Sequence, residues 1–240
     1  MRFIDSIKVE EWTKELGKRL FSIGDASMPA NKMPPGLIWP IKDKRGNNKE
    51  ILDDKIRISE QEARFFLSFI LNETCWHFSV ETPTILEYGF SGRGKRRAST
   101  DLTIYSETEE GLLERSLNVE FKAHNPSDDV ISKEFEKLVK EPVRGWWVHV
   151  LKNIDSGTLP SVFGKIEKSL DKLSKDRNQI KNENIYFSIF IIEKKTILFK
   201  EIACLDEESI KSMFNLKYRI ENGKLIIIDN NAWKIGSLKA

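Results

Sequence analysis

The 240-residue sequence predicts an α/β domain in which a central mixed β-sheet is flanked by helices. Segments with the strand-like alternation of apolar and polar residues lie among segments with helical spacing. Their order along the chain is a helix, three strands, helices and two further strands, which favours layers over separate blocks. Hydrophobic residues make up 40% of the chain and charged residues 32%, so the domain can bury a core.

The beginning of the chain is predicted to be an extension that packs on this core. Residues 1–24 have the apolar spacing of a helix. Residues 29–40 hold four of the eight prolines and are expected to be irregular, and a polar loop follows them. We therefore expect an N-terminal extension at residues 1–55 and a main domain at residues 56–240.

The main domain is predicted to begin with a helix. Ser59 and Glu62 form an S-x-x-E capping box, which predicts a helix through Asn72. Residues 146–151 are apolar and fit either a helix or a strand. The other predicted elements are strands at 84–90, 99–106 and 116–123, helices at 129–141 and 160–180, a hairpin of 185–192 and 196–203, a helix at 206–214, and a C-terminal hairpin that turns at Asn222-Gly223.

Composition and charge exclude several classes of protein. The formal net charge of +2 argues against histone-like phosphate binding, although it permits a local basic patch. Cys75 and Cys204 are far apart and in no C-x-x-C pattern, so a zinc site of the usual spacing is not expected. The apolar segments are too short to span a bilayer and the first residues lack a secretory signal, so we expect a cytoplasmic protein without membrane contact.

Two opposite charges share one face of a predicted strand. Glu120 and Lys122 are two residues apart in the strand at 116–123, so their side chains leave on the same side. Asp101 begins the previous strand and approaches Glu120 if these strands pair. Two converging carboxylates form a site for a hard cation, Mg²⁺ or Mn²⁺, and a nearby lysine can position a water or neutralise charge on a phosphate. The alternative is a surface ladder of salt bridges.

The pattern Asp101-x18-Glu120-Phe121-Lys122 resembles the PD-(D/E)xK nuclease superfamily. The resemblance covers residues 58–200 and implies a restriction-endonuclease-like core. It also implies that Asp101 and Glu120 bind the metal and that Lys122 assists the attacking water. The sequence departs from the family pattern at Thr100, where proline is usual.

The first helix of the main domain contributes a further candidate. The family often has an acidic residue there that faces the metal, and Glu62 shares a helix face with Phe66 and Phe69. Glu62 is also the last residue of the capping box, where a glutamate caps the backbone and needs no other role. Both interpretations remain open.

A basic connector precedes Asp101. Arg93, Lys95, Arg96 and Arg97 lie between two predicted strands, where cations and glycines suit contact with a phosphate backbone. The alternative is a solvated basic loop. The segment from Gly89 to Lys95 nearly matches a P-loop, but no Ser or Thr follows the lysine and the next element is a strand, which excludes that motif.

Together these features predict a Mg²⁺-dependent nuclease that acts on nucleic acid, with DNA expected in preference to RNA. Restriction, phage defence and repair all fit this activity. Two alternatives remain, a nucleic-acid-binding module that does not cleave and a protein-interaction module. The sequence is compatible with a homodimer. His124 is a candidate phosphate contact at a strand end, whereas His149, Trp146 and Trp147 are expected to pack in the core.

Overall fold

The computed structural model describes residues 4–25, 37–39, 58–90, 94–154, 157–176, 180–182, 184–221, 224–230 and 232–237. Within this part of the chain the helices are α1 (Ser6–Ser22), α2 (Glu60–Glu73), α3 (Asp128–Lys140), α4 (Thr158–Ser174) and α5 (Glu207–Met213). The strands of the main sheet are β3 (His77–Phe90), β4 (Gly94–Glu107), β5 (Leu113–Ala123), β6 (Arg144–Leu151), β7 (Ile185–Ile191), β8 (Thr196–Ile202) and β11 (Lys234–Ser237). The short pairs are β1 (Gly24–Asp25) with β2 (Ile38–Trp39), and β9 (Lys217–Glu221) with β10 (Lys224–Asp229).

The main sheet is mixed, as predicted. Its strand order is β11-β8-β7-β6-β5-β4-β3. β3, β4 and β5 form an antiparallel meander, and β5, β6 and β7 run parallel to one another. α3 makes the crossover from β5 to β6, and α4 makes the crossover from β6 to β7.

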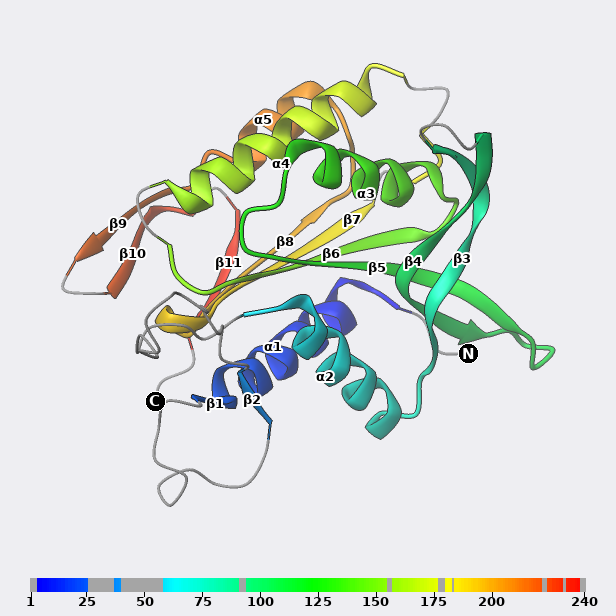
Figure 1. The fold of residues 1–240 in the computed structure, drawn as a ribbon, viewed down its shortest axis with the longest axis horizontal. Helices are drawn as coiled ribbons and strands as arrows, with labels where there is room; N and C mark the ends of the chain where they lie inside the picture. Colours follow the sequence, from blue (N-terminus) through cyan, green and yellow to red (C-terminus); the bar gives the residue numbers. More distant parts are fainter. Residues whose placement is uncertain are drawn as a thin grey trace, which may run out of the picture.

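Helices cover both faces of this sheet (Figure 1). α1 and α2 lie below the sheet in that view, and α3, α4 and α5 lie above it. The core between the lower helices and the sheet includes Trp12, Phe121 and Trp146. The core between the upper helices and the sheet includes Phe135 and Trp147. The α/β class with helices on both faces is thus confirmed. In the part of the chain that the structure describes, no helix is long and apolar enough to cross a membrane.

Local signals in the sequence account for several element boundaries, although α4 ends at Ser174 and not at residue 180 as predicted. Ser59 is the N-cap of α2 and accepts a hydrogen bond from the backbone N–H of Gln61 at 3.3 Å. The ambiguous segment at 146–151 is a strand, β6, which is buried between two parallel neighbours. The C-terminal hairpin forms from β9 and β10, although its turn at Asn222-Gly223 lies outside the described residues.

The first hairpin of the meander is longer than predicted. β3 begins at His77 rather than near residue 84, and its pairing with β4 shifts register between Pro83 and Glu87. β3 is the edge strand, where a proline removes no ladder hydrogen bond. At the shift the fully buried carboxylate of Glu141, at the end of α3, accepts hydrogen bonds from the backbone of β3 and from Tyr88. This contact ties the hairpin to the upper helical layer.

Candidate active site

The candidate site lies where β4 and β5 separate. Their antiparallel pairing ends at Leu102 and Val119, and the next step of that register sets Asp101 opposite Glu120. β5 continues beside β6 as far as Ala123, while β4 continues beside β3. In place of a strand partner, the backbone N–H of Phe121 donates a hydrogen bond to Oδ2 of Asp101 at 2.8 Å. The separation leaves room for side chains between the two strands.

Alternation along β5 sends Glu120 and Lys122 toward α3. Val119 and Phe121 point to the opposite side, into the core between the sheet and the helices α1 and α2. The Nζ atom of Lys122 lies 3.9 Å from Oδ2 of Asp101, so the structure brings the three residues of the sequence motif together. Glu120 is only 1% exposed and Lys122 8%, which is far more buried than a surface ladder of salt bridges would be.

α3 adds two charged residues that no sequence motif had singled out. Oε1 of Glu134 lies 3.3 Å from Nζ of Lys122. Nζ of Lys137 lies 2.6 Å from Oε1 of Glu120 and also contacts Oε2 of Glu134. Glu134 and Lys137 are three residues apart, so they share a helix face, which lies beside the apolar stripe of α3. No sequence signal distinguished them from the other charged residues that border this stripe.

α2 contributes a basic and an acidic residue from the other layer. Nη2 of Arg64 donates to Oδ1 of Asp101 at 2.6 Å, and Nη1 donates to Glu81 on β3 at 2.6 Å. Glu60, one helical turn before Arg64, interacts electrostatically with Lys122 and Asp101, and its burial raises its pKa. The structure therefore puts an acidic residue of α2 near Asp101 and Lys122, and that residue is Glu60.

Glu62, the acidic residue expected there, lies in the capping box. The hydroxyl of Ser59 donates a hydrogen bond to its carboxylate. This contact holds the Glu62 carboxylate at the N-cap residue of α2. A role for Glu62 at a metal stays a prediction, and the contacts of α2 favour Glu60 for it.

These side chains form one network, which we call the ion network. Five of its members are carboxylates and three are cations, so the carboxylates are in excess by two if all are ionised. The members are Glu60, Arg64, Glu81, Asp101, Glu120, Lys122, Glu134 and Lys137. The excess comes from Glu81, whose side chain is 59% exposed, and from the half-buried Glu60, so the six most buried members balance one another in charge.

Burial and neighbouring charges shift the pKa values in opposite directions. Burial raises the pKa of Glu120 well above its usual value, and Lys137 offsets only part of this effect. Burial alone would lower the pKa of Lys122, but the surrounding carboxylates, with Glu134 and Asp101 foremost, raise it overall. Burial alone would raise the pKa of Glu134, but Lys137 and Lys122 lower it. Lys122 therefore stays protonated at neutral pH.

The oxygen atoms of this site fit a hard divalent cation in type. Oε2 of Glu120 is buried and lacks a hydrogen-bond partner, Oε1 lies 2.6 Å from the Lys137 ammonium, and Asp101 points to the same gap between the strands. Carboxylate oxygens are the ligands that Mg²⁺ takes, with water completing its coordination. No group of three or more His, Cys, Asp or Glu side chains that could hold a metal occurs among the described residues. A cation here would thus depend on Asp101 and Glu120 with a carbonyl or waters.

The basic connector is largely part of a strand. Lys95, Arg96 and Arg97, which we call the basic segment, lie in β4 and are exposed, whereas Arg93 lies outside the described residues. The prediction of a loop is wrong for the basic segment, because β3 and β4 are longer than predicted and pair as far as Phe90 and Gly94. Lys95, Arg97 and Asp101 alternate onto one face. At ~3.3 Å per residue, Arg97 lies about 13 Å along the strand from Asp101.

The histidine and tryptophans of β6 belong to the core. Trp146, Trp147 and His149 are 0% exposed, so neither indole is available to stack on a base. Nε2 of His149 lies 2.7 Å from the carbonyl oxygen of His124, and burial lowers the pKa of His149 to about 4. His149 is therefore neutral at physiological pH, and His124 holds a left-handed backbone at the end of β5.

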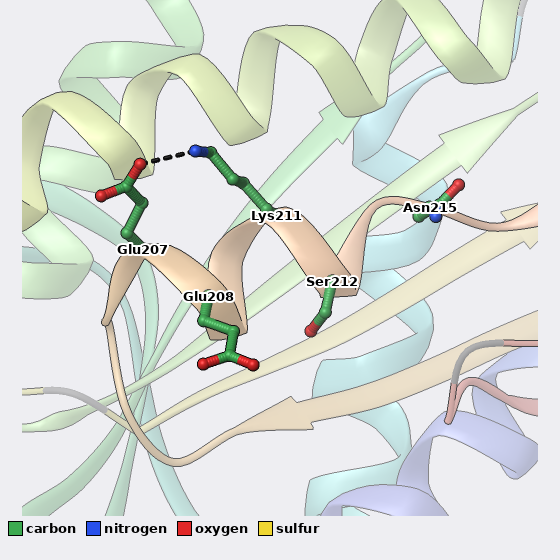
Figure 2. Close-up of a pocket in the computed structure, with 5 residues that line it drawn as sticks. All are labelled: Glu207, Glu208, Lys211, Ser212 and Asn215. Atoms are coloured by element: carbon green, nitrogen blue, oxygen red, sulfur yellow. Dashed lines mark hydrogen bonds and ion pairs between the residues drawn. The ribbon is translucent and has the colours of Figure 1, made fainter.

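A hollow on α5 is separate from the ion network. It has a volume of about 510 Å³, and Figure 2 shows Glu207, Glu208, Lys211, Ser212 and Asn215 along it. Lys211 is paired with Glu207 at 2.5 Å, and all five residues are exposed. Exposed ion pairs of this kind within a helix contribute little and suggest no chemistry.

Comparison of the chain with protein-family models, with curated proteins and with solved structures found no match. Support for a function therefore comes from the residues and the geometry of this chain.

Proposed function

We propose that this protein is a Mg²⁺- or Mn²⁺-dependent nuclease that hydrolyses phosphodiester bonds in nucleic acid. The observation that carries the proposal is the convergence of Asp101, Glu120 and Lys122 where β4 and β5 separate. An acid pair with a protonated lysine beside it suits metal-assisted attack of water on a phosphate. The same three residues carry the resemblance to the PD-(D/E)xK superfamily.

The finer fold is part of this proposal. A restriction-endonuclease-like core would consist of a helix, a three-strand meander, a helix and a further strand. α2, the meander of β3, β4 and β5, then α3 and β6 follow that order. The site residues lie on the second and third strands of the meander, as the resemblance implies.

Each residue of the site has a separate task in this proposal. Asp101 and Glu120 would hold the metal, and Arg64 and the Phe121 N–H orient the Asp101 carboxylate. When bound, the metal would polarise a phosphate oxygen and acidify a water. Lys122 would position the attacking water or neutralise charge that develops on the phosphate.

The basic segment supports nucleic acid as the substrate. Its three cations are exposed, and two of them share the face of β4 that carries Asp101. Lys and Arg side chains at this position can neutralise backbone phosphates and release their counterions. DNA is our preferred substrate over RNA, and restriction, phage defence and repair are the settings we propose for it.

One observation favours a second candidate, a module on the same fold that binds nucleic acid or protein without cleaving. Asp101 and Glu120 already have internal cationic partners, Arg64 and Lys137. A charge network that is satisfied internally can be structural. Oε2 of Glu120, which is buried and has no hydrogen-bond partner, argues for the metal-binding candidate.

A cleavage assay separates the two candidates. The purified protein is incubated with supercoiled plasmid, linear DNA, single-stranded DNA and RNA, with Mg²⁺, Mn²⁺ or EDTA. The nuclease proposal expects cleavage that EDTA abolishes and that Asp101→Asn loses, with partial rescue of Asp101→Asn by Mn²⁺. Binding of nucleic acid without cleavage in either metal would support the second candidate and refute the first.

A further inference from the structure

The ammonium of Lys137 lies among three oxygens from three different elements. It is 2.6 Å from Oε1 of Glu120 on β5 and contacts Oε2 of Glu134 on α3. It also donates to the backbone carbonyl oxygen of Ser99 on β4 at 2.7 Å. Two carboxylates and a carbonyl are the kinds of oxygen ligand that hard divalent cations take in proteins.

This arrangement differs from the ordinary ion pairs of the same helix. Lys140, three residues after Lys137, pairs with Glu136 at 2.6 Å, and these side chains are 21% and 38% exposed. The Lys137 side chain is 11% exposed, and that of its partner Glu120 is 1% exposed. Water can therefore solvate the Glu136 carboxylate when Lys140 moves away. It cannot readily reach the Glu120 carboxylate when Lys137 moves away.

We propose that Lys137 is a resident cation of this site, which balances Glu120 and Glu134 until a divalent cation takes the same oxygens. This inference rests on the proposed function, because it takes Glu120 as a metal ligand. Mg²⁺ binds oxygen at about 2.1 Å, so it cannot share Oε1 of Glu120 with an ammonium at hydrogen-bond distance. The two positive charges also repel each other.

The consequence is a competition between the lysine and the metal. The flexible four-carbon stem of Lys137 lets the ammonium swing away while the helix stays in place. A metal ion that takes Oε1 of Glu120 must displace it, so the wild-type protein binds the metal more weakly than its carboxylates alone would allow. Lys137 thus sets the concentration of divalent cation at which the site fills.

Metal binding to the complete protein tests this competition. The probe is Mn²⁺ alone, and the fraction that stays free is measured by its electron paramagnetic resonance signal. Lys137→Met retains a similar length without the charge, and Lys140→Met is the matched control on the exposed face of α3. We expect Lys137→Met to bind Mn²⁺ about 10-fold more tightly than wild type, a typical size for such a coupling. Lys140→Met should match wild type.

The outcomes separate this inference from the proposed function. If Glu120→Gln abolishes Mn²⁺ binding but Lys137→Met binds no more tightly than wild type, the competition is refuted and the metal site stands. If neither the wild-type protein nor any variant binds Mn²⁺, both the competition and the metal site are refuted. Lys137→Gln guards against misfolding, because its amide can still donate to Ser99. Circular dichroism and melting confirm the fold of each variant, and Lys137→Gln is expected to tighten binding in the same direction.

Discussion

Glu141 is predicted to be a main anchor of the long β3–β4 hairpin, and its replacement tests the tertiary structure directly. Its fully buried carboxylate accepts hydrogen bonds from the N–H groups of Ile85 and Leu86 at 2.8 and 2.9 Å. It also accepts one from the Tyr88 hydroxyl at 3.1 Å. The perturbation is Glu141→Ala, which removes all three hydrogen bonds while leaving the end of α3 free to form.

The expected loss follows from the exposure of the three donors. A hydrogen bond to a charged group contributes about 1.5–3 kcal/mol. Ile85 and Leu86 are 43% and 38% exposed on an edge strand, so water recovers part of their two bonds. Tyr88 is 8% exposed and its hydroxyl would lose its carboxylate partner. We expect Glu141→Ala to lower the free energy of unfolding by about 3–4 kcal/mol, a large fraction of the stability of a domain.

Urea unfolding followed by tryptophan fluorescence measures this loss. Glu136→Ala is the control, because its partner Lys140 is on the exposed side of the same helix, and it should change stability by less than about 0.5 kcal/mol. Amide hydrogen exchange adds a local readout, since Ile85 and Leu86 should lose protection in Glu141→Ala. Equal, small losses in both variants, with exchange at β3 unchanged, would refute the anchoring role.

Three further predictions concern the site. Lys122→Ala should lower the cleavage rate about 100- to 1,000-fold while Mn²⁺ still binds, because the carboxylates supply the ligands; cleavage at the wild-type rate would contradict its role. Changing the basic segment and Arg93 to alanine should make the dependence of DNA affinity on salt less steep. The magnitude of the slope of log affinity against log salt should fall by about 0.9 for each phosphate that the protein no longer neutralises, and an unchanged slope would rule out backbone binding. Burial raises the pKa of Glu120 above 4.5, so the folded protein holds this proton more tightly than the unfolded chain and loses stability as the pH rises above 4.5. Glu120→Gln has no proton to release, so its free energy of unfolding relative to the wild type should rise with pH by up to about 1.4 kcal/mol per pH unit in denaturant titrations. A difference that stays constant with pH would contradict the shift.

Local patterns were sufficient for the elements whose signals lie within a few residues. The N-cap at Ser59 and the apolar spacing after it predict α2 because capping and amphipathicity act within one or two turns. Alternation likewise predicts that Glu120 and Lys122 share a face of β5, since side chains of a strand leave alternately on its two sides. The shared face of these two charges could therefore be predicted from the sequence.

The partners of these charges depended on which surfaces meet in three dimensions. Lys137 reaches Glu120 because the crossover helix α3 folds back over β5, and Arg64 reaches Asp101 because α2 packs on the other face where β4 and β5 separate. Glu60 rather than Glu62 lies beside Lys122, a difference that depends on the rotation of α2 about its axis. A local pattern predicts which residues share a face. The packing of the layers decides what that face contacts, because burial and distance set the strength of a charge interaction.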